Sequence, residues 1–198
     1  MAGNFKVTLV DSNNDPLPDM VVYFQPLDGM VLPVSNKTVE IGQLDRAFTP
    51  YINVMQLGNS ANFQNKDDIT HHIYSPVGEN KFSFKIRAGQ SQRKDDFQQS
   101  GEVAMGCNIH DWVSGYLYIV DTPLFGKTDA QGRVSIAIEQ QGKYQLVVWH
   151  PHLEVENHSV SQQIQWPEST QVMIKIPHKM GKNSEQKNEE DFDFLSDY

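Results

Sequence analysis

Residues 101–120 read GEVAMGCNIHDWVSGYLYIV. Apolar side chains alternate with polar or small ones up to Cys107 and again from Gly115, and this two-residue period is typical of half-buried β-strands. The segment therefore predicts two strands joined by a short loop. Cys107 and His110 flank two residues of that loop, so the thiolate and the imidazole can point at one place. Such a pair favours copper, because thiolate is a soft donor and imidazole is a good borderline donor.

The same alternation recurs along the rest of the chain. It is clearest in residues 4–10, 81–87 and 133–139. Shorter runs of the same kind cover residues 21–24, 52–57, 61–65, 115–120, 144–149 and 171–176. Turn-forming segments separate these runs, and no stretch of ten or more residues carries a helical stripe. Many short strands joined by turns predict an all-β sandwich or barrel, with the polar segment 87–102 as a loop.

The composition is that of an acidic globular protein. The chain has 198 residues, 38% of them hydrophobic, and a formal net charge of -9. An acidic surface repels phosphate backbones, so we expect no nucleic-acid partner. No apolar run approaches the roughly 20 residues of a membrane helix, so we expect no membrane span. The chain as given carries no signal peptide, and we expect that a leader has been removed from a mature form.

Cys107 is the one cysteine of the chain. It cannot form an internal disulfide, and one cysteine is too few for a zinc knuckle or an iron–sulfur cluster. A small buried thiol is the alternative to a metal ligand. Upstream, residues 61–75 predict a strand that ends at Asn65, a polar turn, and then His71 and His72. One histidine from this turn, with Cys107 and His110, would complete the His₂Cys set of a blue-copper centre.

The sequence resembles the cupredoxins, in particular the cupredoxin-like proteins called methylamine-utilization proteins. Three segments carry the resemblance: FQNKDDITHHIYS at 63–75, GCNIHDWVSGYLYIVDTPLFGKTDAQG at 106–132 and YQLVVWHP at 144–151. It spans residues 45–151 and implies a Greek-key β-sandwich that holds one type 1-like copper ion. Carried over residue by residue, the ligands are His71, Cys107 and His110, with His72 as the alternative to His71.

This sequence departs from the cupredoxin pattern at the axial position. Short-loop cupredoxins such as amicyanin place a methionine three residues after the second histidine, and here Val113 stands there. Valine cannot coordinate, so the resemblance implies a three-coordinate site or a weak cap by the Thr70 carbonyl. Loss of the thioether favours Cu(I) and predicts a raised reduction potential. Met105 is either a core side chain or an unusual axial donor.

Other residues carry a functional and a structural interpretation side by side. Trp112, next to Asp111, is either a docking patch over the metal edge or a core aromatic. Asn65 is expected to fix the turn before His71. His150, His152 and His158 could bind a second metal ion, but Pro151 places the first two on a loop, and surface histidines are commoner than metal sites.

The two strand–turn–strand segments at 7–26 and 124–151 look alike. The second, with TDAQGRV as its hairpin and GKYQLVVW as its closing strand, resembles the small sandwich modules of the transthyretin and carboxypeptidase-regulatory type. We therefore expect a copper-binding domain at 1–121 and a small β-sandwich extension at 122–177. The acidic tail 178–198 is expected to be disordered, with a docking peptide around Phe192, Phe194 and Leu195 as the alternative.

These features together predict a mononuclear copper protein that carries single electrons between periplasmic redox partners. We do not expect an enzyme, because the chain has no nucleophile elbow, phosphate-binding glycine loop or paired-histidine zinc motif. Three alternatives stay open: a copper carrier or chaperone, a partner-binding β-module whose copper site has decayed, and a thiol enzyme built on Cys107, His110 and Asp111. The oligomeric state and the redox partner cannot be inferred from the sequence.

Overall fold

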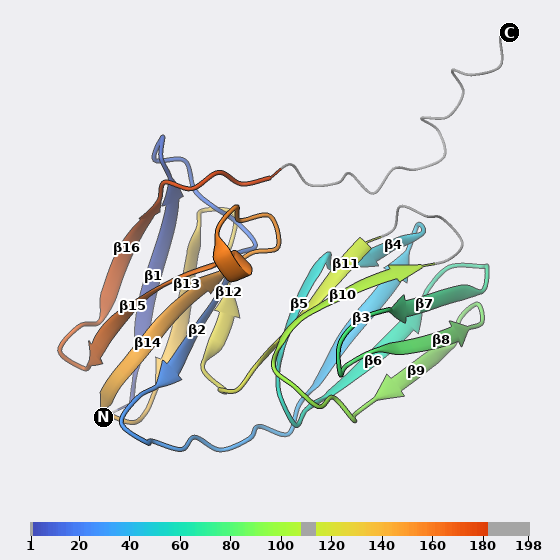
Figure 1. Cartoon of the computed structure of the whole chain (residues 1–198), viewed down its shortest axis with the longest axis horizontal. Coiled ribbons are helices and arrows are strands. Elements are labelled where there is room, and N and C mark those ends of the chain that lie inside the picture. The colour runs from blue at the N-terminus through green and yellow to red at the C-terminus, as the bar shows by residue number, and fades with distance from the viewer. Residues whose placement is uncertain (1, 108–113, 182–198) are drawn as a thin grey trace, which may run out of the picture. The chain divides into compact units, whose positions relative to one another are not determined.

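A computed structural model describes residues 2–107 and 114–181. Within these residues the chain forms two compact units, one from 2–34 with 120–181 and the other from 35–107 with 114–119 (Figure 1). The elements are strands, apart from a three-residue 3₁₀ turn at Glu156–His158. The predicted all-β fold is therefore confirmed. No helix in the described ranges is long and apolar enough to cross a membrane.

The unit formed by residues 35–119, here the central unit, is a sandwich of two sheets. The five-stranded sheet has the order β5 (Ile52–Gln56), β11 (Ser114–Val120), β10 (Gly101–Cys107), β7 (His71–Ser75) and β8 (Phe82–Ile86). The four-stranded sheet has the order β4 (Ala47–Thr49), β3 (Thr38–Leu44), β6 (Ser60–Asn65) and β9 (Ser91–Lys94). Fully buried side chains of both sheets form one core, among them Ile41, Phe63, Ile73 and Leu117.

The alternation of β10 sets which of its residues face this core. Val103, Met105 and Cys107 are buried, whereas the residues between them are partly exposed. Gly115, near the start of β11, lies against the ring of Phe48, because a Cβ built on Gly115 would be 2.8 Å from the Phe48 Cγ. The absence of a side chain at this position lets Phe48 cover the strand where it leaves the 108–113 segment.

The other unit, here the outer unit, is also a two-sheet sandwich. Its three-stranded sheet has the order β13 (Arg133–Ile138), β1 (Gly3–Asp11) and β16 (Gln171–Ile176). Its four-stranded sheet has the order β12 (Phe125–Lys127), β2 (Val21–Pro26), β14 (Gly142–Trp149) and β15 (Ser159–Trp166). Its core combines aliphatic and aromatic side chains, and the rings of Phe5 and Phe24 meet there edge to face at a centroid distance of 5.1 Å.

The predicted domain boundary needs correction, because residues 1–121 do not form one unit. β1 pairs antiparallel with β13 and parallel with β16, and β2 lies between β12 and β14. The first two strands therefore belong with the module expected at 122–177. Alternation predicts that a segment is a strand, but it does not tell which distant strand is its partner. The likeness of 7–26 to 124–151 reflects strands of the same unit.

Two smaller predictions also need correction. Residues 87–102 include strand β9, which pairs with β6 although its side chains are polar, because it is an edge strand with few buried positions. The expected tail is ordered at its start, where Leu153 and Met180 form a β-bridge and the Gly181 N–H donates to the His152 carbonyl. Residues 182–198 lie outside the described residues.

Candidate metal centre

His71 and Cys107 meet at one end of the central unit because β7 and β10 are antiparallel neighbours. Cys107 at the end of β10 is in register with Ile73, two residues after His71 at the start of β7. Residues two apart on a strand share a face, so the His71 ring and the Cys107 thiol both point into the sandwich. His71 Nδ1 lies 3.3 Å from Cys107 Sγ. The two residues are 1% and 2% exposed.

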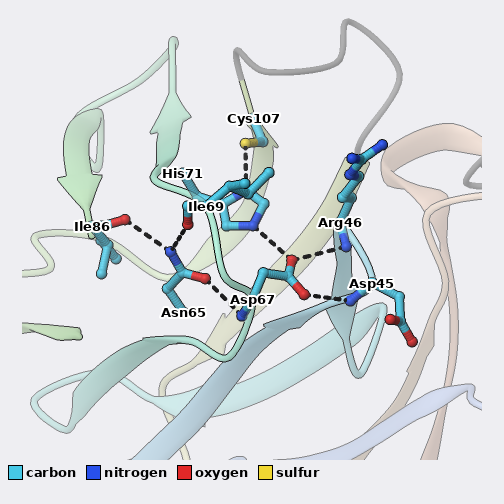
Figure 2. A network of polar contacts seen from close by, with 8 residues as sticks. All are labelled: Asp45, Arg46, Asn65, Asp67, Ile69, His71, Ile86 and Cys107. Atoms are coloured by element: carbon cyan, nitrogen blue, oxygen red, sulfur yellow. Dashed lines mark hydrogen bonds and ion pairs between the residues drawn. The ribbon is translucent and has the colours of Figure 1, made fainter. Parts of the chain in front are cut away.

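The other nitrogen of His71 faces a carboxylate that the sequence did not single out. His71 Nε2 lies 2.7 Å from Asp67 Oδ2, in the turn between β6 and β7 (Figure 2). The same carboxylate accepts the backbone N–H of Asp45 on Oδ1 at 2.7 Å and that of Arg46 on Oδ2 at 2.9 Å. Its four-residue spacing from His71 is the one signal that could have indicated Asp67 from the sequence.

Burial and hydrogen bonding act on Asp67 in opposite directions. Burial opposes ionisation, but the hydrogen bonds from the Arg46 backbone, the His71 ring and the Asp45 backbone outweigh it. The pKa of the Asp67 carboxyl therefore lies below its usual value. Asp67 is ionised at neutral pH, and an ionised carboxylate only accepts hydrogen bonds.

The ionised carboxylate of Asp67 determines the tautomer of the His71 ring. Because Asp67 accepts, Nε2 must carry the proton and donate it. In the neutral ring Nδ1 then has a free lone pair, and this lone pair faces Cys107 Sγ. With Nδ1 as the acceptor, the S–H group of Cys107 is the donor of the hydrogen bond between them. A nitrogen lone pair and a sulfur thus converge on one buried point.

The spacing of these two donors fits a shared metal ion. In structural zinc sites the metal–thiolate bond is about 2.3 Å and the metal–imidazole bond about 2.0 Å, so a near-tetrahedral angle separates sulfur from nitrogen by about 3.5 Å. The observed 3.3 Å is close to this separation. Thiolate with imidazole is also the donor chemistry that copper selects. His71 and Cys107 could therefore hold a copper ion with little movement of either side chain.

Asn65 supports the turn that carries these groups, as predicted. Its Nδ2 donates to the carbonyls of Ile69 at 2.6 Å and Ile86 at 2.9 Å, and its Oδ1 accepts the Asp67 N–H at 3.0 Å (Figure 2). The turn from Asn65 to His71 is thus tied to the neighbouring strand β8. Asn65 is 2% exposed, so these bonds are shielded from water.

The alternative ligand His72 points away from Cys107. Its Nε2 lies 2.6 Å from the hydroxyl of Ser83, a residue of the adjacent strand β8, on the outer face of the sheet. Met105 is 3% exposed and belongs to the hydrophobic core of the central unit, in agreement with its interpretation as a core side chain.

The third predicted ligand, His110, lies outside the described residues, as do Asp111, Trp112 and Val113. Within residues 2–107 and 114–181, no group of three or more His, Cys, Asp or Glu side chains has the geometry of a metal site. The structure therefore brings two of the three predicted ligands together and leaves the third a prediction.

The histidines of the outer unit do not complete a second site. His150 and His152 have ring centroids 5.3 Å apart, but His150 Nδ1 accepts the backbone N–H of His152 at 3.1 Å. In the neutral ring Nε2 then carries the proton, so His150 has no free lone pair for a metal. Burial, followed by the charges of His152 and His158, lowers the pKa of His150 to about 4.

Comparison with solved structures finds copper proteins. The chain is similar to a Cu-containing nitrite reductase from Thermus scotoductus SA-01, with 20% identity and a TM-score of 0.40 over 57% of this chain and 28% of that one. It is also similar to an amicyanin variant in its reduced Cu(I) form, with 13% identity and a TM-score of 0.39 over 44% and 86% of the two chains. A purple cupredoxin from Nitrosopumilus maritimus gives 18% identity and a TM-score of 0.37 over 41% and 99%.

These similarities concern the fold, and their TM-scores lie below 0.5. The matched part spans about a quarter of the nitrite reductase chain, which is 28% covered. No protein-family model matches the sequence. No curated protein matches it either. The specific resemblance to methylamine-utilization proteins remains an expectation from the sequence.

Proposed function

We propose that this protein binds one copper ion through His71, Cys107 and His110 and carries single electrons between redox partner proteins. One observation supports this most strongly: a buried imidazole lone pair and a buried thiol sulfur lie 3.3 Å apart, and a carboxylate fixes the ring from behind. When bound, copper would supply the one-electron couple. His71 and Cys107 are held by neighbouring strands of one sheet, and such a rigid frame limits reorganisation between the two oxidation states.

Burial of His71 and Cys107 favours electron transfer over two of the alternatives, a copper carrier and a thiol enzyme. A copper carrier must hand its ion to a target by ligand exchange, and donors that are 1% and 2% exposed offer little access for an incoming ligand. A thiol enzyme needs its sulfur within reach of a substrate. Electron transfer needs neither, because the electron crosses intervening protein. We therefore propose a non-catalytic role for Cys107.

Copper titration tests the proposal. Addition of Cu(II) to the metal-free chain is expected to produce a thiolate-to-copper charge-transfer band and the paramagnetic-resonance spectrum of one ion per chain. Cys107→Ser should abolish the band, and His71→Ala and His110→Ala should shift or abolish it. His72→Ala is the matched control, since His72 contacts Ser83 and not the thiol. A wild-type chain without the band, or a Cys107→Ser variant with unchanged copper affinity, contradicts the site.

Voltammetry separates an electron carrier from a copper carrier. An electron carrier is expected to cycle reversibly between Cu(II) and Cu(I) without loss of the ion to a chelator, and a copper carrier should release Cu(I).

The proposed periplasmic location rests on the sequence resemblance alone. Fractionation of cells that express the gene tests this location.

A further inference from the structure

We propose that Asp67 is a positioning residue of the copper site. Its carboxylate holds the His71 ring in its ligating tautomer and joins this ring to the turn between β3 and β4. The inference rests on the proposed function, because it concerns the ligand His71. It adds a residue that acts on copper through the ligand His71 and so sets how tightly, and in which oxidation state, copper is held.

The hydrogen bonds of Asp67 leave its carboxylate little freedom. Oδ1 accepts from the Asp45 N–H, and Oδ2 accepts from both the Arg46 N–H and His71 Nε2. The Asp67 backbone is fixed in turn, because its own N–H donates to Asn65 Oδ1. The side chain is 10% exposed, so little water competes for these bonds. A carboxylate held at this many points acts as a rigid support for the ring.

The Asp67 carboxylate also stabilises the turn at Asp45 and Arg46. Both residues have positive φ angles, 53° and 62°, in the two-residue connection between Leu44 of β3 and Ala47 of β4. Two consecutive left-handed residues form the hairpin turn that asparagine and glycine usually occupy. Here Asp67 accepts both backbone N–H groups of that turn. One carboxylate therefore stabilises an unfavourable turn and orients a predicted metal ligand.

The chemical consequence lies in the balance between oxidation states. A carboxylate that accepts the second N–H of a ligating histidine raises the basicity of the ligating nitrogen. The negative charge also favours the more positive ion. Both effects stabilise Cu(II) more than Cu(I), so Asp67 lowers the reduction potential. This effect opposes the raised potential that the sequence resemblance implies from valine instead of methionine at residue 113.

The test compares Asp67→Asn with Asp68→Asn. Asp67→Asn keeps one accepting oxygen but removes the negative charge. Its new amide N–H₂ would face at least one of the groups that donate to Asp67 in the wild type, which are the N–H groups of Asp45 and Arg46 and the His71 ring. Asp68 is exposed and adjacent, so its substitution removes the same charge one residue away. We expect Asp67→Asn to weaken Cu(II) binding by about 10- to 100-fold. With Cu(I) binding unchanged, this raises the potential by about 60 to 120 mV at 59 mV per tenfold change. Asp68→Asn should give less than a third of that shift.

A purely structural role predicts a different result. If Asp67 only stabilises the turn, Asp67→Asn lowers the melting temperature and leaves the potential of the copper-loaded chain unchanged, which would overturn the proposal. ¹⁵N NMR of the metal-free wild-type chain adds a readout that needs no variant to fold. The His71 ring should be protonated at Nε2, and protonation at Nδ1 alone refutes the positioning role.

The outcomes also separate the two proposals. A wild-type chain that gives no charge-transfer band refutes the proposed function, and the copper role of Asp67 with it. A wild-type band together with equal potentials in the wild type and Asp67→Asn refutes the role of Asp67 alone.

Discussion

The ring of Phe48 packs directly against the backbone of Gly115, in place of the side chain that this position lacks. A Cβ built on Gly115 would lie 2.8 Å from the Phe48 Cγ and 2.9 Å from its Cβ. Phe48 is 2% exposed and belongs to the core of the central unit, so its ring is enclosed by other core side chains. This contact fixes the first residues of β11, the strand that follows the segment carrying His110.

Gly115→Ala is expected to destabilise the chain by about 1–3 kcal/mol, because the added methyl overpacks this contact. Chemical denaturation of the metal-free variant measures the loss. Gly106→Ala is the matched control on the neighbouring strand, where the added Cβ would meet the outer end of the Tyr74 ring at 2.9 Å. Tyr74 is only partly buried and can swing away, so this control should lose less stability. Equal losses in both variants would argue against the Phe48 contact.

Asn65→Ala should lower the free energy of unfolding by about 3 kcal/mol, because it leaves two carbonyls and one N–H without their partner in a buried place. Asn65→Asp, of nearly the same size, should not restore stability, since a carboxylate cannot donate to the carbonyls of Ile69 and Ile86. Urea unfolding compares the variants. A stable Asn65→Asp protein would show that shape and not hydrogen bonding holds this turn.

Gln43→Leu is expected to stabilise the chain by about 1–2 kcal/mol, because an unpaired buried amide costs free energy that an apolar side chain of similar size avoids. Among the described residues, neither Gln43 Oε1 nor Nε2 has a hydrogen-bond partner, although the side chain is fully buried. Thermal unfolding of the metal-free chain checks the sign. A destabilised variant would mean that the amide is satisfied in solution.

His150 should make stability fall as the medium is acidified. Its pKa is about 4 in the folded chain and about 6.5 when exposed, so the unfolded state binds more protons between these values. The contribution of His150 to the free energy of unfolding is largest above pH 6.5. It decreases by about 3 kcal/mol as the pH drops to 4, and it does not change further below pH 4. Protonation would also place a donor against the His152 N–H.

Unfolding curves at several pH values test this contribution. His150→Gln should flatten the dependence between pH 4 and 6.5, whereas His178→Gln, at an exposed position, should leave it as in the wild type. An unchanged slope in His150→Gln would assign the dependence to other groups.

The sequence predicts local structure well and distant partners poorly. Alternation correctly indicated the strands β10 and β11, because a two-residue period follows from strand geometry. It did not indicate that β1 pairs with β13 and β16, because pairing depends on contacts far apart in the chain. Edge strand β9 was missed since it buries almost nothing.

The site shows the same limit. The Cys107 and His71 donors were found because thiolate and imidazole are rare, informative residue types. Asp67 was not, since a carboxylate in a polar turn resembles any solvated residue until its three hydrogen-bond donors are seen. Two of those donors come from the distant backbone of Asp45 and Arg46, which no sequence pattern places beside it.

The strands of the outer unit come from both ends of the chain, before and after the central unit in the sequence. This arrangement limits the order in which a nascent chain can fold. The N–H of Met20 is bonded to the Thr128 hydroxyl, 108 residues later. At about 5–20 residues per second, a ribosome needs roughly 5 to 20 s to supply that partner. Residues 35–119 emerge as one continuous stretch in the meantime. The unit with His71 and Cys107 can thus fold before the strands made first have anything to pair with.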